Sequence, residues 1–423
     1  MKILRWYLNS NLLLRIMLGL ILGAVCGIIV GEPISLVQPL GDIFVRSLKM
    51  IVMPVVMSTL VVGAASVHPK NLGKVGGKAL LVYMVTTVIA VVIGLVYGNL
   101  LKPGFGMELP ASAADAVANP AAAPSLIETI MNIVPTNPFA AFSTGNMLPT
   151  IFFCILFGIA ISHLKESDDP RKSRAAQTIY DVFDGAAEVM YMIVNWILQY
   201  APIGVFALIA VVFAKQGPEA LGPLGLTTLS IYLAMLTHIF LTYGLMLMIF
   251  GINPWKFFQK AKPAMLTAFV TRSSGGTLPV SMEVAELDMG IAKGVYSFSL
   301  PLGATINMDG TAIYQGVCVL FISFAIGGDL TLTQQLTVIT TALLASIGTA
   351  GVPGAGVIML MLVLNSIGMK VEPGTKTALA YAMILGIDAI LDMGRTATNV
   401  TGDLAVTCAV AKSEKQMDLS KWE

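Results

Sequence analysis

The sequence predicts an all-α protein that crosses a membrane several times. Hydrophobic residues make up 56% of the 423 residues and charged residues only 12%, whereas soluble domains carry about 25% charged residues. The mean hydropathy is +0.82, and the apolar residues form long blocks rather than the short alternating strands of a membrane barrel. This composition argues strongly against a soluble enzyme or a disordered chain. The net charge of +1 argues against a nucleic-acid partner.

Long runs without charged residues mark the expected spans. A helix needs about 20 apolar residues to cross the hydrocarbon core of a bilayer. Together with an amphipathic stretch at 43–66, the runs predict six helices in the first 255 residues. They cover 16–31, 79–101, 129–162, 189–214 and 220–255. Several runs exceed one crossing, so those helices are expected to tilt, break or extend beyond the membrane.

Lysine and arginine residues gather in alternate connections. They occur at 2–15, 68–78, 164–175 and 256–262, whereas 32–42 and 216–223 contain none. The positive-inside rule then places both termini in the cytoplasm. We therefore expect a multi-pass protein of the cell's inner (plasma) membrane, without a cleavable signal peptide.

Two apolar segments in the C-terminal part are interrupted by small residues. The first reads TRSSGGTLP at 271–279 and the second SIGTAGVPGAG at 346–356. Gly, Ser and Pro at the centre of such segments would form the turn of a re-entrant hairpin. Each segment precedes a helix with a polar motif, NMDGT at 307–311 and NVTGD at 399–403. A hairpin followed by a broken helix is thus predicted twice, an arrangement that points to the binding site of a secondary transporter.

The last apolar segment carries a row of polar residues on one face. At about 100° per residue, their directions fall within a narrow arc. The row consists of Asp388, Asp392, Arg395, Asn399 and Asp403. Each charge at the bilayer centre costs about 2.5–3.5 kcal/mol, so we expect this face to line a wet cavity or to bind a ligand.

Two interpretations of this face are open from the residues alone. The acids and Arg395 could form structural ion pairs, which suits Asp388 best. Three acids against one base instead favour cations as further partners, and carboxylate and amide oxygens suit Na⁺, a hard cation. Arg395 offers a planar fork for a carboxylate and Asp392 an acceptor for an ammonium group. Together they predict an amino acid with a second carboxylate, since Asp392 would repel a purely dicarboxylic ligand.

Four motifs, in order, resemble the signatures of the glutamate/aspartate:cation symporters, also called the dicarboxylate/amino acid:cation symporter family. They are TRSSGGTLP (271–279), NMDGT (307–311), GTAGVPGAG (348–356) and DMGRTATNVTGD (392–403). The resemblance covers nearly the whole chain. It implies an elevator-type transporter with eight transmembrane helices and two re-entrant hairpins in inverted repeats, assembled as a homotrimer in the lipid bilayer. It implies neither an enzyme activity nor an organic cofactor.

The resemblance also implies a division into a scaffold and a moving transport domain. The scaffold would comprise helices 1 and 2 at 1–75, and the external loop with helices 4 and 5 at 102–216. The transport domain would comprise helix 3 at 76–101, helix 6 at 217–252, and a core at 253–412 that contains both hairpins and helices 7 and 8. Residues 413–423 would form a cytoplasmic tail.

Carried over by motif, the resemblance implies a site for an acidic amino acid. Arg395 would bind the side-chain carboxylate of the substrate, Asp392 its amino group and Asn399 its α-carboxylate. The full substrate set is Arg272, Ser273, Ser274, Met308, Thr311, Val352, Gly356, Asp392, Arg395, Thr396 and Asn399.

The resemblance further implies three sodium sites. The first would use Asp403 with backbone oxygens of Gly303, Asn307 and Asn399, and the second backbone oxygens of Thr305, Ser346, Ile347 and Thr349. The third would use Tyr83, Thr86, Thr87, Asn307 and Asp309.

The leading hypothesis is uptake of L-aspartate or L-glutamate driven by sodium. The alternative is a proton-coupled glutamate symporter or a C4-dicarboxylate symporter of the same family. Gln315 stands where animal members carry a proton-linked glutamate, which argues against their proton and potassium countertransport. The sequence does not separate aspartate from glutamate, because one methylene is worth only about 1–3 kcal/mol in a pocket.

Overall fold

The computed structural model describes residues 12–65, 75–107, 109, 131, 134–144, 146–347, 349, 351 and 354–422. Over these residues the fold is helical, and the one β-bridge is an isolated pair between Ile291 and Met417. Six helical stretches are long and apolar enough to cross a membrane, namely Glu32–Ala65, Gly77–Leu101, Pro170–Ala214, Gly217–Ile249, Lys293–Ala325 and Lys376–Ser413. Three shorter apolar helices, Leu14–Val30, Pro149–Lys165 and Ala355–Ser366, add to these, so the described chain agrees with a polytopic helical membrane protein.

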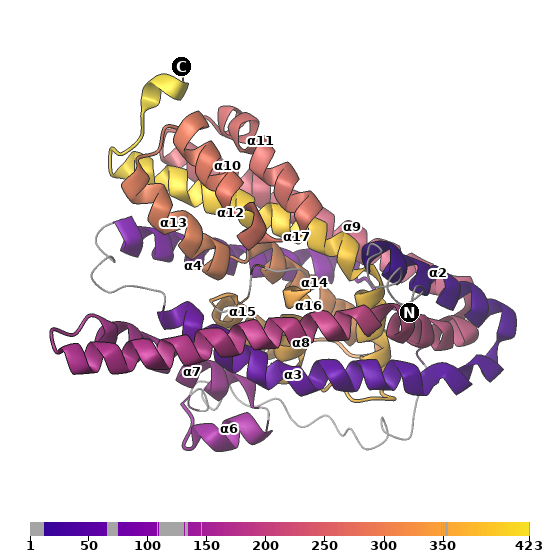
Figure 1. Cartoon of the computed structure of the whole chain (residues 1–423). Coiled ribbons are helices and arrows are strands. Elements are labelled where there is room, and N and C mark those ends of the chain that lie inside the picture. Colours follow the sequence, from indigo (N-terminus) through magenta and orange to yellow (C-terminus); the bar gives the residue numbers. More distant parts are fainter. Residues whose placement is uncertain are drawn as a thin grey trace, which may run out of the picture.

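One group of helices packs around a single long helix, α8 (Pro170–Gln216). Its other members are α2 (Leu12–Val30), α3 (Gln38–Ala65) and α7 (Met147–Lys165), with the short α6 (Pro138–Thr144) beside α7. At about 1.5 Å per residue, the 47 residues of α8 reach about 70 Å, so this helix extends well beyond one crossing, as expected. Figure 1 shows α3 and α8 lying side by side.

Glycines spaced four residues apart let α2 approach α8 closely. A Cβ added at Gly19, Gly23 or Gly27 would lie 2.4–2.6 Å from a carbonyl oxygen of α8. Small residues at such a spacing permit close packing of helix backbones in membranes. The backbones of α2 and α8 are therefore in close contact along this face.

Replacing Gly23 with leucine should lower the thermal unfolding temperature of the purified protein. The new Cβ would lie 2.6 Å from the carbonyl oxygen of Phe206, and overpacking of this kind costs about 1–3 kcal/mol. Gly185→Ala is the matched control, because nothing lies within 4 Å of its Cβ position on α8. Equal unfolding temperatures for Gly23→Leu and the wild type would contradict the close α2–α8 contact.

A second group surrounds the C-terminal helices. It includes α4 (Gly77–Leu101), α9 (Leu221–Thr237), the π-helical turn η4 (His238–Tyr243) and α10 (Gly244–Ile249). Helix α4 packs against α14 (Asp309–Ala325), where a Cβ at Gly94 would lie 2.5 Å from the carbonyl oxygen of Ile313. Helix α4 therefore contacts the core at 253–412, with which the resemblance groups it.

Both predicted hairpins are present as helix pairs. The first consists of α11 (Pro254–Thr271) and α12 (Ser274–Glu283), which continues into the π-turn η5 (Val284–Asp288). The second consists of α15 (Leu332–Ser346) and α16 (Ala355–Ser366). Arg272 ends α11 in the left-handed conformation, with φ of 55°, and the Ser273 hydroxyl caps α12 by accepting from the Gly276 N–H at 2.9 Å. The polar small residues thus form the first turn, as predicted.

The two polar motifs differ in backbone structure. In the first, α13 (Lys293–Ile306) ends and α14 begins after the non-helical Asn307 and Met308. In the second, α17 (Lys376–Ser413) runs unbroken through Asn399, so the prediction of a second broken helix is wrong. The side chain of Asn399 contacts the first motif. Its Oδ1 accepts a hydrogen bond at 2.8 Å from the Gly310 N–H, one of the N–H groups in the first turn of α14 that have no partner within the helix.

The predicted cytoplasmic tail packs back onto the chain. The Asp418 N–H donates to the Gly290 carbonyl at 2.8 Å, and the Trp422 indole N–H donates to the Met289 carbonyl at 2.9 Å. Glu414 pairs with Lys78 at the start of α4. The tail therefore links the end of α17 to the connection between η5 and α13.

Candidate functional site

Arg395 lies at the centre of the polar face of α17. Its guanidinium donates to Asp388 at 2.9 Å and to Asp392 at 2.8 Å, and it lies over the ring of Tyr314 at 4.2 Å. Its side chain is only 1% exposed. Gly356 of α16 gives the guanidinium room, because a Cβ there would lie 2.7 Å from Cζ. Arg395 therefore forms ion pairs with both Asp388 and Asp392 in this structure, and both ends of its fork are engaged.

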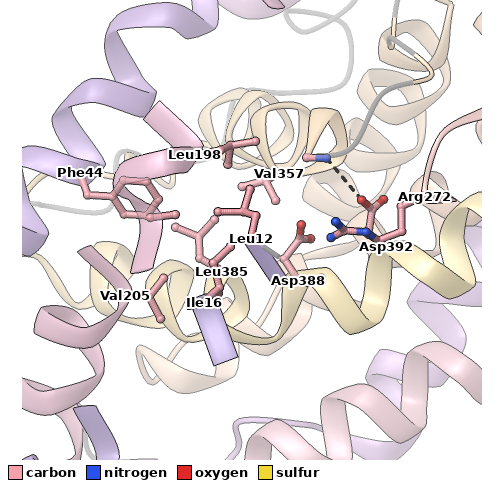
Figure 2. A pocket seen from close by; sticks show the side chains of 13 residues that line it. Leu12, Ile16, Phe44, Leu198, Val205, Arg272, Val357, Leu385, Asp388 and Asp392 are labelled. Atoms are coloured by element: carbon pink, nitrogen blue, oxygen red, sulfur yellow. Dashed lines mark hydrogen bonds between the residues drawn. The ribbon is translucent and has the colours of Figure 1, made fainter. Parts of the chain in front are cut away.

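A small cavity adjoins the two aspartates. Figure 2 shows Arg272, Asp388 and Asp392 at one end and the apolar side chains of Ile16 and Phe44 at the other. The Gly354 N–H donates to Asp392 Oδ2 at 3.3 Å. The volume is about 40 Å³, which suits a few waters and is too small for an amino acid. A solute could reach Asp392 only if one of the surrounding elements moved.

The tips of the two hairpins touch beside this cavity. The Ser273 hydroxyl donates to the Gly351 carbonyl at 2.8 Å, and the Gly275 N–H donates to the same oxygen at 3.2 Å. Ser274 is buried at the same tip. Val352, also predicted to bind substrate, lies outside the described residues. The hairpin tips therefore form one wall between the site and its surroundings.

Asn399 gathers further members of the substrate set. Its Nδ2 lies 3.2 Å from Met308 Sδ and 3.5 Å from Thr311 Oγ1. Thr396 is buried on the same helix, one turn before Asn399. The structure thus brings Met308 and Thr311 to the polar face of α17, as the motifs predict.

The first predicted cation set forms a contiguous group. Asn307 Nδ2 donates to Asp403 Oδ1 at 2.9 Å and to the Asn399 carbonyl at 3.0 Å. Asn307 Oδ1 is buried without a hydrogen-bond partner. A Cβ at Gly303 would lie 2.5 Å from Asp403 Oδ1, so this glycine leaves room for the carboxylate. An unsatisfied oxygen beside a buried carboxylate is the donor set that a hard cation requires.

The third predicted set centres on Asp309, which is fully buried. The Thr87 hydroxyl donates to Asp309 Oδ1 at 2.6 Å. The Tyr83 hydroxyl donates instead to the Ser299 carbonyl at 3.0 Å, and the Thr86 hydroxyl to a carbonyl of its own helix at 3.1 Å. The structure therefore joins Thr87 to Asp309 but turns the other two hydroxyls away.

The second predicted set is less assembled. The hydroxyls of Thr305, Ser346 and Thr349 each donate to a carbonyl three or four residues earlier, at 2.7–2.9 Å. Ile347 follows Ser346 at the end of α15. The second hairpin nevertheless lies near α13, because a Cβ at Gly351 would be 3.1 Å from the Ala304 carbonyl. The backbones of the hairpin and α13 approach each other, and within the set the Thr349 N–H donates to the Ser346 carbonyl at 3.3 Å.

Comparison with known proteins agrees with this geometry. The model of the sodium:dicarboxylate symporter family matches residues 12–413. The chain belongs to this family.

Curated relatives cover nearly the whole symporter. The proton/sodium-glutamate symport protein of Bacillus caldotenax is 39% identical over 96% of this chain and 95% of its own. The proton/glutamate-aspartate symporter of Escherichia coli (strain K12) is 34% identical over 100% and 96%. The C4-dicarboxylate transport protein of Bacillus subtilis (strain 168) is 32% identical over 98% and 96%. The symporter is therefore a multi-pass membrane transporter and not an enzyme.

The buried acids of the symporter fall into two pairs with different partners. Asp388 and Asp392 both contact Arg395. Asp309 and Asp403 have hydroxyl, amide and imidazole partners and no contact with lysine or arginine among the described residues. No group of three His, Cys, Asp or Glu side chains forms a metal cluster in the described ranges. Because buried anions require compensating charge, the oxygen-rich second pair suits a hard cation rather than a transition metal.

Three side chains of the site were missed from the sequence. Tyr314 stacks under Arg395, and His238 and Tyr243 both contact Asp309. His238 and Tyr243 belong to none of the four motifs. Tyr314 carried a usable signal, because it lies three residues after Thr311 on α14 and therefore on the same helix face.

Proposed function

We propose that this symporter takes up L-aspartate or L-glutamate together with sodium ions. The observation that carries the proposal is the pair of buried carboxylates, Asp309 and Asp403, together with the unpartnered Oδ1 of Asn307, whose Nδ2 donates to Asp403. A cation there would neutralise the acids and complete the hydrogen-bonding capacity of the amide oxygen. The names of the relatives, which include proton/sodium-glutamate symport, support the same class of cargo.

The substrate would replace one of the two carboxylate partners of Arg395. The side-chain carboxylate of the amino acid would take the place of Asp388 on the guanidinium fork, since an external carboxylate can form the same bidentate pair. Asp392 would then be free to accept the ammonium group, with Thr396 beside it. Asn399 and Ser274 would hold the α-carboxylate. This arrangement gives an acidic amino acid three points of attachment.

Entry requires movement, because the cavity holds only about 40 Å³. The second hairpin would act as the gate, since its Gly354 N–H holds Asp392 and its Gly351 carbonyl holds the first hairpin. The helices around α8 would form the scaffold of a homotrimer in the inner membrane, with both termini in the cytoplasm. The core at 253–412, with α4 and α9, would move against that scaffold as an elevator.

Purified protein in liposomes should accumulate radiolabelled aspartate when an inward sodium gradient is imposed. A pH gradient alone, acid outside with choline as the external cation, should leave uptake near background. Accumulation that follows the pH gradient and ignores sodium would contradict sodium coupling and favour the proton-coupled alternative.

A C4-dicarboxylate substrate is the second candidate. The observation in its favour is that Asp392 already contacts Arg395 at 2.8 Å, which lessens its repulsion of a dianion, and one relative is named a C4-dicarboxylate transport protein. Competition decides between the two. We expect excess glutamate to block aspartate uptake and excess succinate to leave it nearly unchanged; strong inhibition by succinate would favour the second candidate.

A further inference from the structure

Asp309 is held by two side chains that belong to one unusual turn. Tyr243 Oη donates to Asp309 Oδ2 at 2.7 Å, and His238 Nε2 lies 3.1 Å from the same oxygen. The two residues bound the π-helical turn η4. In an α-helix, residues five apart point about 140° away from each other, whereas a π-turn closes at that spacing. The widened turn is therefore what brings both donors to one carboxylate.

The contacts of His238 specify which ring nitrogen carries the proton. An ionised carboxylate only accepts hydrogen bonds, so Nε2 must be the donor to Asp309. Nδ1 is fully buried and has no partner, and a second proton there would leave a buried donor without an acceptor. In this arrangement Nε2 therefore carries the hydrogen that bonds to Asp309. The rings of His238 and Tyr243 pack edge to face, with 4.6 Å between their centroids, and this contact helps fix the two side chains relative to each other.

The same turn reaches the predicted cation ligands on the other side. A Cβ at Gly402 would lie 2.3 Å from Tyr243 Oη and 2.6 Å from Asn307 Nδ2. Both polar groups therefore lie against the backbone of Gly402. With Thr87 on Oδ1 at 2.6 Å, the Asp309 carboxylate is restrained in both position and rotation. Its neighbour Asn307 retains one unpartnered oxygen, Oδ1.

We propose that His238 and Tyr243 are positioning residues, here named the Asp309 clamp, that set the affinity of the Asp309–Asn307 region for the coupling cation. The clamp rests on the sodium coupling proposed above. It acts by holding Oδ2 from outside, so that the carboxylate presents a fixed orientation to the ion. Groups that hydrogen-bond a ligating carboxylate in this way commonly contribute a factor of about 10–100 to metal affinity.

Sodium-dependent thermal stabilisation of the purified protein tests the clamp without transport. Unfolding temperatures are measured against NaCl concentration, with choline chloride keeping the ionic strength constant, because a ligand of the folded state stabilises it in proportion to its occupancy. Tyr243→Phe and His238→Leu should raise the half-saturating sodium concentration on the order of 10-fold. His238→Gln, which retains an N–H donor, should stay close to wild type.

Tyr97→Phe is the matched control. It removes the 2.7 Å hydrogen bond between Tyr97 on α4 and Thr237 on α9, the residue just before His238. This bond does not involve Asp309. The sodium titration of Tyr97→Phe should therefore equal that of the wild type. The KM for aspartate at saturating sodium should remain unchanged in Tyr243→Phe, since the clamp contacts no predicted substrate ligand.

The outcomes separate the clamp from the proposed function. Wild-type protein without any sodium-dependent stabilisation would overturn sodium coupling, and the clamp with it. Sodium-dependent wild type with unchanged titrations in both Tyr243→Phe and His238→Leu would overturn the clamp alone. Equal losses in His238→Gln and His238→Leu would also overturn it, because the hydrogen bond would then not be the cause.

Discussion

Replacing Arg395 with glutamine should abolish uptake of aspartate into liposomes. The change removes the only cationic partner that Asp388 and Asp392 have among the described residues, and it removes the fork proposed to bind the substrate. Truncating one partner of a buried, hydrogen-bonded charge pair costs about 2–5 kcal/mol of binding free energy, and each 1.4 kcal/mol is a factor of ten in binding. We therefore expect a loss on the order of 100-fold, measured as initial uptake of radiolabelled aspartate at saturating sodium.

Asp388→Asn separates the two roles of Arg395. It keeps the shape of the side chain and the Asp392 pair, and it weakens the contact that the substrate carboxylate must replace. We expect this variant to retain uptake. Retained aspartate uptake in Arg395→Gln, with the purified protein monodisperse, would contradict the substrate role of Arg395.

Replacing Asp403 with asparagine should have a comparably large effect on sodium dependence. Asp403 is 3% exposed, and its Oδ1 accepts from Asn307 beside the unpartnered Asn307 Oδ1. The isosteric change removes a full negative charge from the cation's surroundings, so the half-saturating sodium concentration should rise more than about 10-fold, in line with other losses of ion-binding groups. Sodium-dependent unfolding temperature measures this directly.

Asp418→Asn is the control for this charge change. Asp418 is exposed and bonds with Ser420 in the tail, so its sodium titration should match that of the wild type. An unchanged half-saturating concentration in Asp403→Asn would show that this acid is not part of a cation site.

Helical periodicity predicted the most important surface of the molecule. The spacing of Asp392, Arg395 and Asn399 places them on one side of a helix, and the structure keeps all three buried on α17. The runs of Gly, Ser and Pro likewise predicted both hairpins, because those residues permit tight turns. Local sequence was sufficient for the polar face of α17 and for the two hairpin turns.

Tertiary approach explains what the sequence did not reveal. The second polar motif predicted a break that α17 does not have. The glycines of both motifs make room for neighbours: a Cβ at Gly310 would lie 2.3 Å from the Arg395 carbonyl oxygen, and one at Gly402 would lie 2.3 Å from Tyr243 Oη. The π-turn at His238 has no periodic signature, so its contact with Asp309 was not predictable. The contact between Arg395 and Asp388 joins residues seven apart, and only the folded geometry shows that it forms.

Calorimetric titration of aspartate into the purified symporter, at a series of NaCl concentrations and constant ionic strength, tests most directly whether cations and substrate share this buried network. Because ligands that stabilise one arrangement raise each other's affinity reciprocally, the Kd for aspartate should fall steeply as the sodium concentration rises. When choline replaces all the sodium, the heat of aspartate binding should disappear. An aspartate Kd that is the same in choline and in sodium would contradict the account.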